Sequence, residues 1–197
     1  MTGKDKQMKI TMIMLAAGNS SRFGSNKLLQ LIDGKPMYMH TLEKLIKASE
    51  YFEDSRVIVV TQYDEIITET QKLGIDCYVN RCPQRGISSS MQIGLRQAQK
   101  SDACLFAVAD QPNLSAKTIV SLVQLFMDEN KGMACTRCGD RTGNPCIFGH
   151  RYFRELMILS GDRGGKALIK KYPGVVSYLD VHNETELRDV DMPSDLL

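Results

Sequence analysis

Short apolar runs alternate with amphipathic segments along the whole chain. The apolar runs have strand length and are bounded by glycine or small polar residues, a pattern typical of strands buried on both faces. They predict strands at residues 10–17, 56–61, 75–79, 104–109, 132–136 and 175–179, and residues 146–148 form one more apolar stretch. Apolar residues at helical spacing predict helices at about residues 36–48, 64–73, 115–130 and 151–159, and two more helices that begin at Ile87 and Ala167. This order predicts an α/β fold, a single-domain, doubly wound sandwich of the Rossmann type with a mostly parallel sheet.

The length and composition are those of one ordinary globular domain. The chain has 197 residues, of which 43% are hydrophobic and 24% charged. Residues 1–9 are polar and are expected to be a tail that precedes a domain at residues 10–197. The formal net charge of +2 gives no reason to expect a nucleic-acid partner. No run approaches membrane-spanning length and no signal peptide is evident, so we expect a cytoplasmic protein that binds no membrane and keeps its six cysteines reduced.

A loop rich in glycine and serine follows the first predicted strand. It runs from Gly18 to Gly24 and contains Arg22, and Lys27 comes three residues later. Such a loop can turn several backbone N–H groups toward one point, and the two cations add charged donors, which together suit a polyphosphate. The alternative is an ordinary turn between a strand and a helix, with a surface arginine.

Two well-known phosphate-binding loops do not fit this segment. A Walker A loop has four residues between its glycines and a lysine directly after the second one, whereas five residues separate Gly18 from Gly24 here. The dinucleotide fingerprint needs a glycine where the chain has Ser20, and no acidic residue ends the next strand to hold a ribose.

A carboxylate follows the strand predicted at residues 104–109. Asp110 comes directly after it, where a buried carboxylate is costly unless it is paired or bound to a cation. Ligands of doubly wound sheets gather outside the carboxyl ends of strands where the strand order reverses. If this strand neighbours the first one, Asp110 faces the Gly18–Gly24 loop, and a magnesium ion between Asp110 and nucleotide phosphates would offset the cost of burial. The alternative is that Asp110 caps a nearby helix.

Two other helix starts carry polar groups that suit a ligand. The helix that begins at Ile87 has three serines in its first turn, although a single serine would be enough to cap it. Residues 160–166 form a second glycine-rich loop that leads into a helix, and glycines and cations at a helix start can bind an anion. A plain connection between helices is the alternative for this second loop.

Four possible zinc ligands lie close together in the sequence. They are Cys135, Cys138, Cys146 and His150. A single C-x-x-C lacks the second pair of a zinc ribbon, so the alternative is that Cys135 ends one strand, Cys146 begins the next, and both pack as small hydrophobic side chains. The sequence leaves both interpretations open.

The first loop, read as L-A-A-G-x-S-x-R-F-G-x-x-K, resembles the signature of nucleotidyltransferases that activate small molecules with CTP, GTP or UTP. Within these MobA-like NTP transferases it is most similar to the molybdenum cofactor cytidylyltransferases, because the guanylyltransferase branch typically begins L-A-G-G. Four later segments match the family in order: GISSSMQIGL at residues 86–95, D-x-P at Asp110, G-N-P at Gly143, and G-D-x-G-G-K at Gly161. The closing segment, DVDMPSD at residues 189–195, resembles D-I-D-T-P-E-D. Lys166 replaces the usual arginine, Met192 the usual threonine and Ser194 the usual acid.

This resemblance implies a nucleotide-diphospho-sugar-transferase-like fold and assigns roles to individual residues. Arg22, Lys27 and Asp110 are the implied catalytic residues, and Asp110 and Asp191 the implied metal ligands, although Asp191 could instead be a turn residue before Pro193. The implied nucleotide-binding residues are Leu15, Ala16, Ala17, Gly18, Ser20, Ser21, Arg22, Gly24, Lys27, Gly86, Ser88, Ser89 and Ser90. The implied acceptor-binding residues are Gly143, Asn144, Pro145, Gly161, Asp162, Gly164, Gly165 and Lys166.

The resemblance implies a Mg²⁺-dependent enzyme that transfers CMP from CTP to the terminal phosphate of molybdopterin and releases pyrophosphate. Its product, the cytosine dinucleotide form of the molybdenum cofactor, would pass to a hydroxylase that resembles xanthine dehydrogenase. Three alternatives remain open: a transferase that uses GTP or a sugar phosphate, a non-catalytic protein that binds nucleotide and cofactor for molybdenum hydroxylases, and a structural zinc protein.

Overall fold

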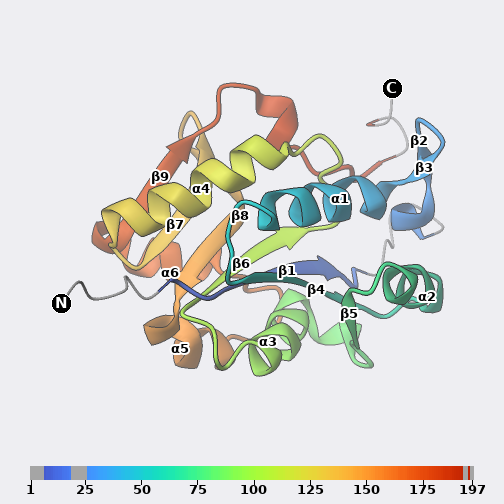
Figure 1. Ribbon diagram of the computed structural model, residues 1–197, viewed down its shortest axis with the longest axis horizontal. Helices are drawn as coiled ribbons and strands as arrows, with labels where there is room; N and C mark the ends of the chain where they lie inside the picture. Colours follow the sequence, from blue (N-terminus) through green and yellow to red (C-terminus); the bar gives the residue numbers. More distant parts are fainter. Residues whose placement is uncertain (1–6, 19–25, 193–194, 196–197) are drawn as a thin grey trace.

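A computed structural model describes residues 7–18, 26–192 and 195, and its architecture is an α/β sandwich (Figure 1). Among the described residues, seven strands form the main sheet in the order β5-β4-β1-β6-β8-β7-β9. These strands are β1 (Ile10–Ala16), β4 (Ser55–Thr61), β5 (Asp76–Val79), β6 (Ala103–Val108), β7 (Met133–Cys138), β8 (Arg141–Gly149) and β9 (Val176–Asp180). The helices are α1 (Met37–Ser49), α2 (Asp64–Lys72), α3 (Ile87–Gln97), α4 (Ala116–Glu129), α5 (Phe153–Met157) and α6 (Lys166–Lys171).

The sheet is mostly parallel, as the sequence predicted. Strands β5, β4, β1 and β6 run parallel to one another, and β7 runs parallel to β9. Strand β8 is antiparallel to both β6 and β7, and it extends well beyond the apolar stretch expected at residues 146–148. Strand β6, which precedes Asp110, pairs directly with the first strand, β1, so the condition that was set from the sequence is met.

Two hydrophobic layers cover the two faces of the sheet. Along β1, Met12 and Met14 pack in the layer that contains α1 and α4, whereas Ile13 and Leu15 pack in the layer that contains α3. Successive strand side chains point to opposite faces, so an uninterrupted apolar run is what a strand covered on both faces requires. Figure 1 shows α1 and α4 on one side of the sheet and α3 and α5 on the other.

Close packing between α3 and β1 depends on Gly94. A Cβ atom at this position would lie 2.7 Å from the Cγ2 atom of Ile13, so the glycine lets the helix approach the strand. This places the first turn of α3 beside the carboxyl end of β1, which is where the candidate site lies.

Two local predictions needed correction. Pro36 is not the first helical residue: the turn at Asp33 and Gly34, both with positive φ, folds residues 31–36 into a small hairpin of β2 (Leu31–Ile32) and β3 (Lys35–Pro36) before α1 begins. The helix expected at residues 151–159 is shorter, because a 3₁₀ turn at His150–Tyr152 precedes α5. No helix within the described ranges has the length and apolar character needed to cross a membrane.

Candidate active site

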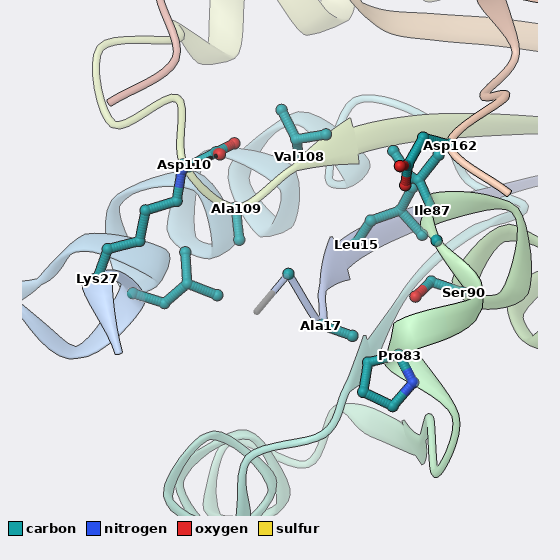
Figure 2. Close-up of a pocket in the computed structure, with 13 residues that line it drawn as sticks. Leu15, Ala17, Lys27, Pro83, Ile87, Ser90, Val108, Ala109, Asp110 and Asp162 are labelled. Atoms are coloured by element: carbon teal, nitrogen blue, oxygen red, sulfur yellow. Dashed lines mark hydrogen bonds and ion pairs between the residues drawn. The ribbon is translucent and has the colours of Figure 1, made fainter. Parts of the chain in front are cut away.

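The carboxyl ends of β1 and β6 lie side by side and form the floor of a cavity. Leu15 pairs with Val108, and the chain then leaves the two strands through Ala17-Gly18 and Ala109-Asp110. The first cavity has a volume of about 320 Å³ (Figure 2). It is lined by Leu15, Ala17, Gly18, Lys27, Leu28, Pro83, Gly86, Ile87, Ser90, Val108, Ala109, Asp110 and Asp162.

Lys27 lies at one end of this first cavity and joins two carboxylates. Its Nζ atom is 2.7 Å from Asp110 Oδ2 and 3.0 Å from Asp191 Oδ1, and it also donates to the carbonyl oxygen of Val190 at 2.8 Å. A 3₁₀ turn at Lys27–Leu29 holds the lysine there, and the side chain of Asn26 caps this turn by accepting from Leu28 N. The sequence did not predict that this lysine contacts both carboxylates.

Electrostatics keep Lys27 charged in spite of its burial. Its side chain is only 11% exposed, and this desolvation lowers its pKa. The charge of Asp110 and the hydrogen bonds to the two carboxylates act in the opposite direction and prevail, so the pKa of Lys27 is raised above 10.5. The ammonium group is therefore a permanent positive charge at neutral pH.

The same oxygen atoms suit a divalent cation. Asp110, Asp191 and the Val190 carbonyl already converge on one positive charge, and carboxylate and carbonyl oxygens are the ligands that Mg²⁺ and Mn²⁺ take. A third carboxylate, Asp189, is held nearby by the Gln111 side-chain amide at 2.8 Å. Burial raises the pKa of Asp189, and the charge of Asp110 adds to this effect.

The other end of the first cavity is built by the start of α3 and the loop before it. Ser90 lines the cavity, together with Pro83, Gly86 and Ile87. The buried Asn80 side chain donates to the hydroxyls of both Ser89 and Ser90 at 2.9 Å. Asn80 therefore fixes the serine-rich turn, and only Ser90 of its three serines lines the first cavity.

Two further cavities adjoin the first one. A second cavity of about 210 Å³ shares Leu15, Ile87 and Asp162 with it and extends under residues 164–166 toward Phe148. A third cavity of about 900 Å³ shares Asn144 and Lys166 with the second and also includes Asp191. The second cavity therefore links the first to the third. The third cavity also reaches the Lys27 end of the site through Asp191, which contacts Lys27, so a nucleotide and an acceptor could meet there.

The second glycine-rich loop forms the wall between the cavities. Gly165 packs so closely on Phe148 that a Cβ atom there would lie 2.5 Å from the aromatic ring. Gly164 and Gly165 line the second cavity, and Gly143 lines the third. Pro145 and Gly161 line none of the three cavities, although Gly161 contacts the start of α3.

The remaining residues assigned from the sequence fall into two groups. Ala16 is buried with the opposite layer of the sheet, and its carbonyl accepts from the Thr61 hydroxyl at 2.8 Å, so it does not line the first cavity. Ser20, Ser21, Arg22 and Gly24 lie outside the described residues, as do most of the polar tail at residues 1–9 and the Pro193-Ser194 pair.

The zinc interpretation is wrong because strand β8 separates the four candidate ligands. Cys138 pairs near Arg141 at one end of β8, whereas His150 follows the other end of that strand. Cys135 and Cys146 face each other in between as buried free thiols. Among the described residues, no group of three or more His, Cys, Asp or Glu side chains is placed to hold a zinc ion.

Several residues of the site were not predicted from the sequence. Asn80 and Gln111 position other side chains, and Asp189 is one of three acids in the closing segment, of which only Asp191 was chosen. Phe106 and Phe148 line the second cavity but carry no polar signal in the sequence. Asp189 could have been found, because its spacing of two residues from Asp191 places both acids in one short segment beside Asp110.

Comparison with known proteins agrees with this fold. Residues 12–176 match the MobA-like NTP transferase domain family, and the chain belongs to that family of nucleotidyltransferases. A probable molybdenum cofactor guanylyltransferase of Thermococcus sibiricus is 34% identical over 119 residues, which are 60% of this chain and 56% of that protein. The purine catabolism protein PucB of Bacillus subtilis is 26% identical over 196 residues, which are 93% of this chain and 92% of that protein.

Solved structures support the fold. Rv0371c of Mycobacterium tuberculosis superposes with a TM-score of 0.79 and 24% identity over 95% of each chain. A complex of the same protein with manganese has a TM-score of 0.71 and 22% identity over 89% of each chain. The match to the Thermococcus protein spans little more than half of that protein's length, so the family, rather than a particular activity, is what these comparisons establish.

Proposed function

We propose that the protein is a Mg²⁺-dependent nucleotidyltransferase that transfers CMP from CTP to the terminal phosphate of molybdopterin and releases pyrophosphate. The observation that carries this proposal is the cluster of Lys27, Asp110 and Asp191. It combines a fixed cation and two carboxylates: Lys27 and Asp110 line the first cavity, and Asp191, which contacts Lys27, lines the third.

The chemistry requires charge neutralisation and positioning. A phosphate nucleophile is already anionic at neutral pH, so no general base is needed, and the site contains no nucleophile–base pair among the described cavity residues. Asp110 and Asp191 would hold the metal ion, which would neutralise charge on the α-phosphate and the departing pyrophosphate. Lys27 would contact the triphosphate, and Arg22 and the Gly18–Gly24 loop would complete its binding.

The acceptor is proposed to enter from the second and third cavities. Lys166 and Asn144 line both of them, and a lysine can bind a phosphate of the acceptor as a point charge, without the bidentate geometry of an arginine. The third cavity is the largest of the three, which suits an acceptor as large as molybdopterin. A xanthine-dehydrogenase-like hydroxylase remains the proposed recipient of the product.

The choice of CTP rests on Ala17. This residue lines the first cavity at the position where the guanylyltransferase branch typically has glycine, and its methyl group would narrow the space available to a base. A pyrimidine needs less room than a purine. GTP is the second candidate, because relatives such as the Thermococcus protein are named guanylyltransferases.

Pyrophosphate release tests the proposal directly. Purified protein with Mg²⁺ is given CTP, GTP, UTP or ATP, each with and without molybdopterin, and the Asp110→Asn variant serves as the inactive control. We expect release with CTP only when molybdopterin is present. Release with GTP instead would retain the chemistry and overturn the base assignment, whereas nucleotide binding without release under any condition would favour a non-catalytic role.

A further inference from the structure

Asp162 occupies a position that its assignment to the acceptor does not explain. It belongs to the segment between α5 and α6, yet it lines both the first and the second cavity. Figure 2 shows its carboxylate beside Ile87 and Leu15, at the far end of the first cavity from Lys27 and Asp110. It therefore lies away from the cluster that would hold phosphates.

Backbone packing against Gly86 brings Asp162 to this position. A Cβ atom at Gly86 would lie 2.4 Å from the carbonyl carbon of Gly161 and 2.6 Å from Asp162 Oδ1. Gly86 has a φ of +79°, and the N–H of Ser88 donates to Gly161 O at 3.2 Å. The absence of a side chain at Gly86 and this hydrogen bond let the loop that carries Asp162 rest directly on the first turn of α3.

The carboxylate is available for a ligand. Over the ranges that the structure describes, Asp162 forms no hydrogen bond or ion pair, and the residue is exposed to solvent. An ionised carboxylate only accepts hydrogen bonds, and it repels phosphate. Its chemistry at this place suits a neutral group with two neighbouring donors, and it does not suit an anionic acceptor phosphate.

We propose that Asp162 binds the 2′- and 3′-hydroxyls of the nucleotide ribose and thereby selects ribonucleotides. This inference rests on the proposed function, because it takes the first cavity to be the nucleotide site. With the triphosphate at Lys27 and the base among Ala17, Pro83 and Ser90, the ribose lies between them and faces the second cavity, where Asp162 is. Carboxylates hold ribose hydroxyls in this way in other nucleotide sites.

Equilibrium binding of three nucleotides tests the inference without any acceptor. CTP, 2′-deoxy-CTP and 3′-deoxy-CTP are titrated with Mg²⁺ into the wild-type protein and the Asp162→Ala variant, by calorimetry. We expect the wild type to bind CTP about tenfold more tightly than either deoxynucleotide, because each lost hydroxyl removes a hydrogen bond to a charged group. Asp162→Ala should bind CTP about tenfold more weakly, bind the deoxynucleotides nearly as the wild type does, and so lose the discrimination.

Matched variants separate this role from a structural one. Arg163→Ala changes the next residue of the same loop, which lines none of the three cavities, and Asp128→Ala removes an exposed acid from α4; both should keep the wild-type discrimination. Asp162→Asn keeps one acceptor oxygen and should show an intermediate preference for CTP. Circular dichroism of each variant reports its folding.

Three results would overturn the inference. Equal weakening of all three nucleotides by Asp162→Ala would assign Asp162 to the base or to the loop's structure. If Asp162→Ala left nucleotide binding unchanged but raised the KM for molybdopterin, Asp162 would instead be assigned to acceptor binding. A wild-type protein that binds none of CTP, GTP, UTP or ATP would overturn the proposed function and this inference with it, and that result is seen before any variant is made.

Discussion

The Nζ atom of Lys27 lies 2.7 Å from Oδ2 of Asp110, although 83 positions separate the two residues in the chain. The contact joins the 3₁₀ turn after the first loop to the end of strand β6, and Asp191 approaches the same ammonium from the closing segment. Three distant parts of the sequence therefore come together at the Lys27 ammonium group. Catalysis by charge neutralisation needs such an arrangement to be in place before the substrate binds.

Substitution Asp110→Asn is expected to lower turnover by about two to four orders of magnitude, because it removes a charge from the proposed metal site while keeping the side chain's size. The fold should persist, since Asp191 and the Val190 carbonyl still contact Lys27. We expect the free energy of unfolding to fall by only about 1–2 kcal/mol. Steady-state pyrophosphate release and urea unfolding measure the two effects.

The exposed Asp128 of α4 supplies the control for this substitution. Asp128→Asn makes the same chemical change far from the cavities and should leave both turnover and stability near the wild-type values. An Asp110→Asn protein that turned over normally would contradict the assignment of Asp110 to the metal site.

Removal of the Lys27 ammonium should change metal binding and turnover in opposite directions. In Lys27→Ala the carboxylates of Asp110 and Asp191 lose their shared cation, so Mn²⁺ without nucleotide should bind more tightly than in the wild type, by about tenfold. Turnover should fall, because the triphosphate loses a fixed positive charge. Electron paramagnetic resonance of free Mn²⁺ measures the affinity. Weaker Mn²⁺ binding in Lys27→Ala would mean that the two carboxylates do not share a cation site.

Substitution Gly86→Ala is expected to weaken nucleotide binding more than tenfold. A Cβ atom at Gly86 would collide with the backbone of Gly161, and the displaced loop would leave the wall between the first two cavities open. Gly74 is the matched control: its φ is +71° but nothing lies within 4 Å of an added Cβ. Gly74→Ala should therefore cost about 1 kcal/mol of stability from backbone strain alone and leave nucleotide binding unchanged. Similar binding losses in both variants would show that strain, rather than the contact with Gly161, causes the effect.

The cysteines should differ in their rates of alkylation. Burial raises the pKa of Cys77 to about 11, so about one thiol in a thousand is ionised at pH 8, whereas Cys82 is exposed. We expect iodoacetamide at pH 8 to modify Cys82 first, and the rate at Cys77 to rise as the pH approaches 11, because the thiolate is the reactive form. Peptide mass spectrometry follows each site, and Cys82→Ser should lack the fast adduct. Rapid alkylation of Cys77 at pH 8 would contradict its burial.

Local patterns in the sequence were enough to predict most of the strands and helices. Continuous apolar runs identify strands covered on both faces, and glycine at positive φ ends α2 at Gly74, because these effects act between near neighbours in the chain. The apolar run before Asp110 likewise predicted that this carboxylate follows a buried strand. Together with the alternation of strands and helices, this predicted that a ligand site would lie at the carboxyl edge of the sheet.

Only the tertiary structure decided which of these residues meet. Cys135, Cys138, Cys146 and His150 are close in sequence, but an extended strand holds Cys138 and His150 apart and excludes the zinc site. Lys27 and Asp110 are far apart in sequence, yet the parallel pairing of β1 with β6 brings their segments together. Sequence spacing determines local conformation through short-range sterics. Contacts between distant residues depend instead on how the sheet and its two hydrophobic layers pack, and a short motif does not specify that packing.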